Sequence, residues 1–193
     1  MKFIIMQPPI TEILDEVFGL YEKFGNADYI GEPVSQIEHM SQAAQLAMDE
    51  GFDDEVILAA FFHDIGHICV NQNEANSMDG YGVKSHEKVG ADFLRLKGFP
   101  ERVAKLVENH VQAKRYLTFK YPEYFRSLSE ASKKTLEFQG GVMEQEEAEA
   151  FEKDLLFETS IRMRKWDELA KEVDVALVDL EEMKSKARQI LSS

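Results

Sequence analysis

A run of apolar residues near the middle of the chain ends directly in a histidine and an aspartate. Residues 56–62 are all apolar and lead into His63 and Asp64. A helix that is apolar on all sides is typical of the centre of a protein, and Asp53 or Asp54 can cap its beginning. A carboxylate at the end of such a helix is costly to ionise unless a cation or hydrogen-bond donors compensate it. The run therefore predicts a fold built around one buried helix that carries polar chemistry at its end.

The rest of the chain is also patterned for helices. Between Val34 and Ala47, apolar residues recur every three or four positions, which indicates an amphipathic helix, and Gly51 follows as its end. Further helices are predicted over residues 11–24, 85–97, 100–116, 129–139, 144–157 leading into 160–170, and 175–191. Neither strand alternation nor an internal repeat is present. The sequence predicts an all-α fold, a single helical bundle of seven or eight helices.

Loops are predicted where glycine, proline and polar residues gather. The paired prolines Pro8 and Pro9 favour an extended N-terminal arm, and residues 25–33 contain two glycines and a proline. Residues 69–82 and 121–125 are predicted to connect helices. We expect one domain over residues 1–193, with a core at about 27–170, an N-terminal arm and a C-terminal helix.

Charge and cysteine content exclude several classes of partner. The chain has 36 acidic and 22 basic residues and a net charge of −14, so phosphate backbones and anionic membranes would repel it. The single cysteine, Cys69, cannot form an internal disulfide. No apolar stretch approaches the ~20 residues that span a bilayer, and the N-terminus lacks the pattern of a signal peptide. We therefore expect a cytoplasmic protein with no nucleic-acid or membrane partner. The oligomeric state is not fixed by the sequence.

All five histidines lie at helix ends or beside apolar stripes. They are His39, His63, His67, His86 and His110. A single histidine in such a position is more often a hydrogen-bonded core residue, but five together with Asp64 predict a metal site. Imidazole and carboxylate ligands suit iron, manganese and similar ions, so ligand type alone does not choose the metal.

The spacing of these residues resembles the HD-domain superfamily. Its hallmark is a His-Asp pair, here His63-Asp64, preceded by His39 twenty-four residues earlier and followed by a distant aspartate, assigned to Asp167. The resemblance implies an all-helical HD domain with a divalent metal. His86 and His110 match the branch that holds two metals, in which Asp64 bridges the ions. The implied ligand set is His39 and Asp167 on one ion and His86 and His110 on the other, with the pair His63-Asp64 between them.

Longer strings resemble one group within this superfamily. They are residues 28–32 (Asp-Tyr-Ile-Gly-Glu), 80–82 with 86–92, 110 with 113–117, and 136–141. These strings resemble the mixed-valent di-iron oxygenases that cleave carbon–phosphorus bonds in 1-hydroxy-2-aminoethylphosphonates, and the resemblance covers about residues 27–167. It implies two iron ions, Fe(II)/Fe(III), with O2 as co-substrate and a small phosphonate as substrate.

The reaction that this resemblance implies begins with removal of the hydrogen on C1. The carbon–phosphorus bond is then broken oxidatively, which gives phosphate and an amino acid. The product is glycine from the free amine and glycine betaine from the trimethylated one. The trimethylated substrate is the closer match within the group, although no single residue decides between the two amines.

The resemblance also assigns roles to the loop at residues 29–32. Tyr29 is implied to be a mobile metal ligand that leaves when the substrate binds, and Glu32 its neighbour near the amine. Tyr29 and Asp64 are the implied catalytic residues. A glycine-flanked loop can move in this way. The alternative is that Tyr29 is only a loop aromatic packed on the surface.

Four further residues are predicted to bind the phosphonate. Lys114 lies one helical turn after His110, and His67 one turn after His63, so each should share space with a metal ligand. Ser132 and Arg164 are implied by the resemblance alone, and Arg suits oxyanions. The alternative for these two is a solvated helix residue and a surface ion pair.

Two other functions compete with the oxygenase. An HD-type metal-dependent phosphohydrolase would use the same ligands to activate water and cleave a small phosphate ester, but it leaves the Tyr29 loop without a role. A metal-stabilised sensor or adaptor domain would need no reaction, and it predicts eroded ligands, whereas every ligand position here is filled.

Overall fold

The structure is a computed structural model that describes residues 8–29, 31–71 and 74–193. Its α-helices are α1 (Ile10–Phe24), α2 (Gln36–Asp49), α3 (Asp54–Phe62), α4 (His86–Leu96), α5 (Glu101–Lys120), α6 (Pro122–Ser127), α7 (Glu130–Phe138), α8 (Gln145–Phe151), α9 (Phe157–Leu169) and α10 (Leu180–Leu191), with 3-10 helices η1 (Ile65–His67) and η2 (Glu74–Asn76). Within these ranges, extended pairing is limited to two isolated β-bridges. The predicted all-α class is confirmed.

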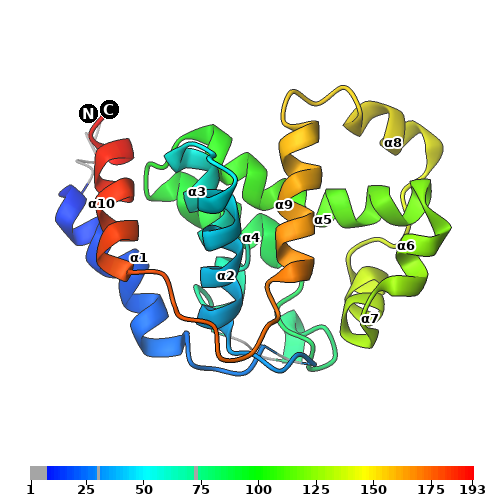
Figure 1. Cartoon of the computed structure of the whole chain (residues 1–193), viewed down its shortest axis with the longest axis horizontal. Helices are drawn as coiled ribbons and strands as arrows, with labels where there is room; N and C mark the ends of the chain where they lie inside the picture. Colours follow the sequence, from blue (N-terminus) through cyan, green and yellow to red (C-terminus); the bar gives the residue numbers. More distant parts are fainter. Residues whose placement is uncertain (1–7, 30, 72–73) are drawn as a thin grey trace, which may run out of the picture.

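The apolar run of residues 56–62 forms the central helix α3. Asp53 caps α3 by accepting a hydrogen bond from the backbone N–H of Val56 (3.2 Å), and residues 56–62 are all buried. Helices α2, α5, α9 and α10 all contact α3, which lies between α10 and α9 in Figure 1. Phe61 and Phe62 also meet the rings of Phe18 and Tyr21 on α1. The core therefore surrounds the helix that ends at His63 and Asp64.

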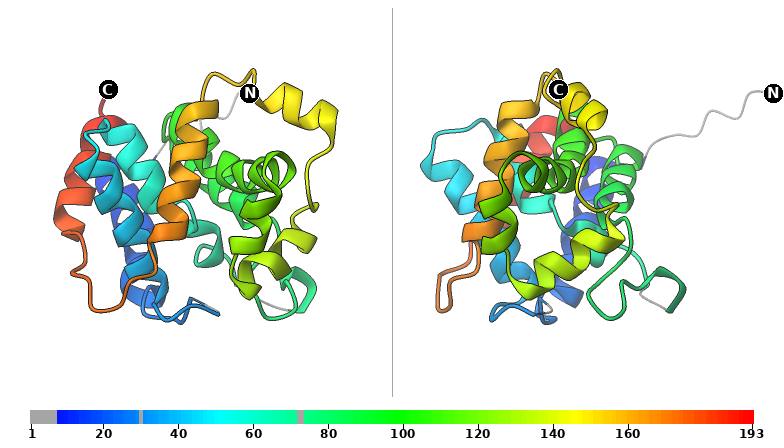
Figure 2. Two further views of the ribbon diagram at one scale, coloured as in Figure 1. Left: turned by 45° about the vertical axis from the view of Figure 1, so that its right-hand side comes forward. Right: turned by 90° about the vertical axis from the view of Figure 1, so that its right-hand side faces the viewer.

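The helices that carry the predicted site residues pack against each other around the end of α3. Helix α9 lies against both α2 and α5, and α4 lies along α5. Figure 2 shows α10 next to α1 on one side of the molecule. Helices α6, α7 and α8 lie around the C-terminal half of α5. A second, small apolar cluster forms there, in which Tyr116 of α5 packs with Met143 and Phe151. No helix in the described part of the chain is long and apolar enough to cross a membrane.

The structure differs from the predicted helices at several boundaries. It has ten α-helices over the described residues, more than predicted, because residues 122–127 form α6 with Pro122 in its first turn, where proline is tolerated. The last helix begins at Leu180 rather than Val175, because Asp179 caps it. Ser85, at the predicted start of the helix of residues 85–97, has a φ of +53° and makes no side-chain cap, and α4 begins at His86. Most of the predicted N-terminal arm lies in residues 1–7, outside the described residues.

Candidate metal centre

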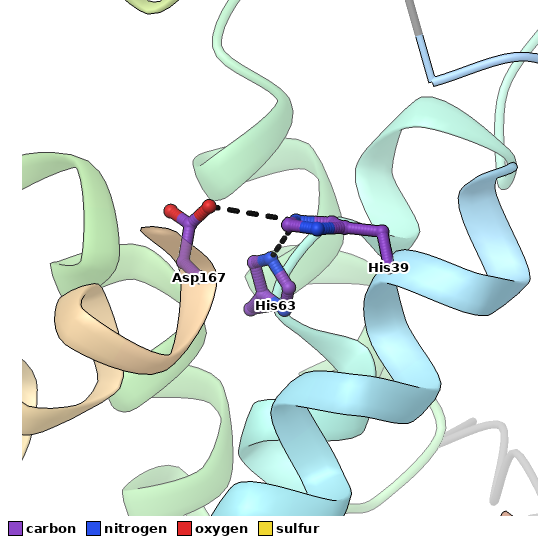
Figure 3. Close-up of side chains that lie close together, drawn as sticks. All are labelled: His39, His63 and Asp167. Atoms are coloured by element: carbon purple, nitrogen blue, oxygen red, sulfur yellow. Dashed lines mark hydrogen bonds and ion pairs between the residues drawn. The ribbon is translucent and has the colours of Figure 1, made fainter. Parts of the chain in front are cut away.

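The six side chains predicted as histidine and carboxylate ligands lie together at the centre of the fold. They come from α2 (His39), the end of α3 (His63 and Asp64), the start of α4 (His86), α5 (His110) and α9 (Asp167), and all are buried. Figure 3 shows His39, His63 and Asp167 pointing toward one another from three segments of the chain. Gly66 allows α4 to approach, because a Cβ there would lie 1.9 Å from the carbonyl oxygen of His86.

The ligands form two groups, one on each side of Asp64. In the inner half, defined as His39, His63 and Asp167, the Nε2 of His39 lies 2.9 Å from the Nε2 of His63 and 3.4 Å from the Oδ1 of Asp167. In the outer half, defined as His86 and His110, the two Nε2 atoms are 3.1 Å apart. Two ligands at right angles around one ion with bonds of about 2.1 Å would be about 3.0 Å apart. The spacing in both halves therefore fits a metal ion.

Asp64 faces both halves with different oxygen atoms. Its Oδ2 lies 3.6 Å from the Nε2 atoms of both His39 and His63. Its Oδ1 lies 3.2 Å from the Nε2 of His86 and 3.5 Å from that of His110. A carboxylate placed in this way can bridge two cations.

Backbone carbonyl groups fix the ring orientation of three of these histidines. The Nδ1 atoms of His39, His63 and His110 lie 2.9, 2.8 and 2.6 Å from the carbonyl oxygens of Ala170, Ala60 and Val107. Each Nδ1 must carry a proton to make this bond, so the Nε2 of a neutral ring presents a lone pair to the centre. Facing lone pairs at 2.9 Å, as in His39 and His63, repel each other unless a cation lies beside them.

For His63, His110 and the two carboxylates the electrostatics favour the protonation states that bind metals, whereas Asp64 outweighs burial and raises the pKa of His86. Burial lowers the pKa of His63, and it lowers the pKa of His110 to about 3. Burial alone would raise the pKa of Asp64 and Asp167, but His63 holds the first, and Arg164 the second, well below the usual range. Neutral imidazoles and ionised carboxylates are the forms that coordinate metals.

His67 differs from the other histidines in its hydrogen bonding. Its Nδ1 accepts a hydrogen bond from the backbone N–H of Val83 (3.0 Å), so the proton of the neutral ring is on Nε2. Gly82 allows this contact, since a Cβ there would lie 2.5 Å from the ring of His67. His67 is close enough to Asp64 and His86 to complete a group of three potential ligands. Its hydrogen-bonding pattern instead makes Nε2–H a donor that points toward the centre.

A pocket opens over the outer half of the centre. Its lining includes Asp64, His86, His110 and Asp167 of the centre, together with Tyr29, Glu32, His67, Lys114, Ser132 and Arg164. His39 and His63 do not line it. The pocket therefore reaches every residue that the sequence assigned to the substrate.

The two cations in the pocket, Lys114 and Arg164, differ in how many partners they have. Burial, and then the charge of Arg164, lower the pKa of Lys114 to about 7, and its Nζ donates to the Oγ1 of Thr135 (3.0 Å). Arg164 is only 4% exposed, pairs through Nη1 with Asp167 and donates through Nε to Tyr124 and Glu168, while its buried Nη2 has no hydrogen-bond partner. The alternative of a surface ion pair at Arg164 is wrong. Both side chains can donate to an oxyanion in the pocket.

Tyr29 packs against the centre rather than on the surface. Its ring stacks on that of His39, with centroids 4.0 Å apart and an interplanar angle of 14°. Burial and the neighbouring Asp64 raise the pKa of the Tyr29 hydroxyl well above its usual value. On the same loop, the Oε1 of Glu32 accepts hydrogen bonds from Ser129 (2.7 Å) and Lys171 (2.6 Å). The loop therefore lies over the pocket.

Three polar residues of the pocket were not predicted from the sequence. Thr135 and Gln139 line it together with Ser132, and Gln36 lies on α2 one turn before His39. The spacing of residues 132, 135 and 139 on one helical face could have indicated the first two. The Oε1 atoms of Gln36 and Gln139 are buried without a hydrogen-bond partner.

Fold and site together define an all-α metalloenzyme. The profile of the HD domain matches residues 37–152. Uncharacterized protein L432 of Acanthamoeba polyphaga mimivirus is 43% identical over 183 residues, 95% of this chain and 84% of that protein. The [1-hydroxy-2-(trimethylamino)ethyl]phosphonate dioxygenase (glycine-betaine-forming) of Leisingera caerulea is 40% identical over 86% of this chain and 84% of its own length. The hydroxymethylphosphonate dioxygenase of Gimesia maris is 35% identical over 93% and 89%.

The chain therefore belongs to the HD-domain family and, within it, to the phosphonate dioxygenases. This membership confirms the predicted class of enzyme, a dioxygenase that cleaves a carbon–phosphorus bond and depends on a metal and oxygen. The interpretation as a sensor or adaptor without activity is wrong.

Proposed function

We propose that the protein uses O2 to cleave the carbon–phosphorus bond of (1R)-1-hydroxy-2-(trimethylamino)ethylphosphonate or a closely related 1-hydroxy-2-aminoethylphosphonate. The products are glycine betaine, or glycine, and phosphate. The observation that carries the proposal is the placement of Asp64, whose two oxygens face separate histidine pairs beneath a pocket with Lys114 and Arg164. The relatives named for trimethylaminoethyl and hydroxymethyl phosphonates support this choice of substrate class.

The proposed reaction balances without an external reductant. The carboxylate and phosphate products together contain two more oxygen atoms than the substrate, and one molecule of O2 supplies both. The four electrons that reduce O2 come from the substrate, through loss of the C1 hydrogen and of the carbon–phosphorus bond. One O2 should therefore be consumed for each phosphate released.

The proposed metals are two iron ions, one held by the inner half with Asp64 and the other by the outer half with Asp64. Tyr29 is proposed as the additional ligand of the resting site, which leaves when the substrate binds. The iron pair, when bound, supplies the activation of O2 and the redox capacity to remove the C1 hydrogen. The buried imidazoles hold these positions without competing protons, since burial keeps His63 and His110 neutral by lowering their pKa.

The protein's own contribution to substrate binding lies mainly at the phosphonate end. We assign Lys114, the Nε2–H of His67, the unpartnered Nη2 of Arg164 and the side chain of Ser132 to the phosphonate oxygens. Charge-assisted hydrogen bonds to such an anion are the strong ones. An anion beside Lys114 would also favour its protonated form, against the lowering of its pKa by burial.

The proposal covers the whole chain as one unit. Helices α1 and α10, which lie outside the predicted core of residues 27–170, bury apolar residues in the same cluster as α3. We therefore treat residues 1–193 as a single HD domain. We keep the cytoplasm as its predicted location and a small phosphonate as its partner.

The test combines metal analysis with phosphate release. Protein expressed with iron is assayed with the free and trimethylated amines of 1-hydroxy-2-aminoethylphosphonate, with and without O2, and with a phosphate ester of the same length. About two irons per chain and one O2 consumed per phosphate are expected. Hydrolysis of the ester without O2, or a single metal ion, would instead indicate the phosphohydrolase.

A further inference from the structure

The carboxylate at the amine end of the pocket already has a cationic partner. The Nζ of Lys171 lies 2.6 Å from the Oε1 of Glu32, and the same oxygen accepts the hydroxyl of Ser129 at 2.7 Å. Glu32 is the pocket residue proposed to meet the substrate amine. Lys171 lies in the segment that follows α9 and does not line the pocket itself. The negative charge of Glu32, which would attract a substrate ammonium, is therefore already paired with Lys171, a residue outside the pocket lining.

The backbone on both sides of Lys171 is held by the metal centre and by α2. The carbonyl oxygen of Ala170 lies 2.9 Å from the Nδ1 of His39. Gln42 clamps Glu172 twice, accepting from its backbone N–H (3.1 Å) and donating to its carbonyl oxygen (2.8 Å). With both neighbours fixed, Lys171 is held in reach of Glu32, unlike the partners of an exposed surface ion pair. The pair is also largely covered, with side chains 19% and 10% exposed.

We propose that Lys171 is a specificity-determining residue. It occupies, on Glu32, the position that the ammonium of an aminated substrate would take. A substrate amine must displace Lys171 or share one carboxylate with it, and like charges at that distance repel. A 1-hydroxyphosphonate without an amine meets no such competition. Lys171 therefore lowers the preference for aminated substrates and widens the range to 1-hydroxyphosphonates that lack the amine. This inference rests on the proposed function.

The decisive experiment measures a preference rather than a rate. kcat/KM is determined for the trimethylated substrate and for hydroxymethylphosphonate, and their ratio is compared between variants. Lys171→Met should raise the ratio about tenfold, the effect of one charge-assisted contact. Lys171→Arg keeps the charge and should keep the wild-type ratio. Lys133→Met, which removes a lysine paired with Glu130 away from the pocket, is the control for net charge.

A double-mutant cycle tests whether Glu32 transmits the effect. In a Glu32→Gln background the carboxylate is gone, so Lys171→Met should leave the ratio unchanged. An equal change in both backgrounds, or no change in the native background, would overturn the inference. Lys171→Gln, which keeps the hydrogen bond but not the charge, replaces Lys171→Met if the latter does not fold.

Calorimetry separates failure of this inference from failure of the proposed function. Both phosphonates are titrated into the iron-loaded protein without O2. If the wild type releases no phosphate, the proposed function fails, and the ratio of the two affinities still decides the role of Lys171. A wild type that binds neither phosphonate would overturn both proposals.

Discussion

The inner and outer halves of the metal centre differ in how they meet the pocket. His39 and His63 are fully buried, do not line the pocket, and each has its Nδ1 tied to a backbone carbonyl. His86 and His110 line the pocket, and the Nδ1 of His86 is buried with no hydrogen-bond partner. The imidazoles of the inner half are enclosed by protein, and its carboxylate Asp167 reaches the pocket, whereas both imidazoles of the outer half face whatever enters the pocket.

This difference assigns separate tasks to the two halves. Two of the proposed donors for an oxyanion, Lys114 and His67, lie with the outer half, because they are one turn from His110 and beside His86, whereas Arg164 is paired with Asp167. The inner half instead joins α2, α3 and α9 into one body. We therefore expect the phosphonate to bind over the outer half, while the inner half contributes more to the stability of the fold. Asp64, which faces both halves, should couple them.

The largest expected effect comes from removing that coupling residue. Asp64→Ala should abolish activity and strip both metals, because each half loses its carboxylate ligand. Metal analysis after expression with iron measures the loss, and Asp92→Ala, a carboxylate on the exposed face of α4, is the control. A variant that retains two metals per chain would show that Asp64 does not bridge.

The two halves can then be compared directly through one histidine from each. His39→Ala removes the hydrogen bond to Ala170 and leaves a cavity in the core, so we expect a loss of about 2–4 kcal/mol in the free energy of unfolding. His86→Ala opens toward the pocket and breaks no Nδ1 bond, so a loss of about 1 kcal/mol is expected. Denaturation of both variants without metal measures the difference. Equal losses would show that the halves do not differ in stability.

The sequence predicted the chemistry of the centre better than its surroundings. His39, His63-Asp64 and the residues one turn away, His67 and Lys114, follow from motif and helical spacing. Helical spacing is a local signal, and the motif is fixed by the fold of a known family. The roles of these residues in catalysis stay predictions.

What the sequence could not predict depends on contacts between distant segments. The proton position of His67 is set by the backbone of Val83, in a loop that no periodicity describes. The pairing of Lys171 with Glu32 joins residues 139 positions apart. The mix of aromatic and polar residues at 121–125 favours a connection, whereas the structure forms helix α6 there, with Pro122 suited to its first turn.

A smaller effect is expected at the phosphonate end of the outer half. Lys114→Ala should weaken substrate binding by about 1.5–3 kcal/mol, a lost charge-assisted contact, with little change in the metals. Because burial lowers the pKa of Lys114 to about 7, the free wild-type enzyme loses this charge as the pH rises through 7, and kcat/KM should fall there. Lys114→Arg stays charged and should move the fall to higher pH. An unaltered KM in Lys114→Ala would remove Lys114 from the binding site.

The smallest effect on metal content is expected for Tyr29→Phe, which tests whether the loop of residues 29–32 contributes a ligand to the metal centre. Without metal, burial and Asp64 raise the pKa of the Tyr29 hydroxyl and keep it protonated. Cations on both sides of Asp64 would cancel that influence and favour the phenolate. Tyr29→Phe keeps the ring that stacks on His39, so both metals should remain, while any visible phenolate-to-iron absorption of the resting enzyme disappears. An unchanged spectrum would show that Tyr29 is only a packing residue, and the loop would then act through Glu32 alone.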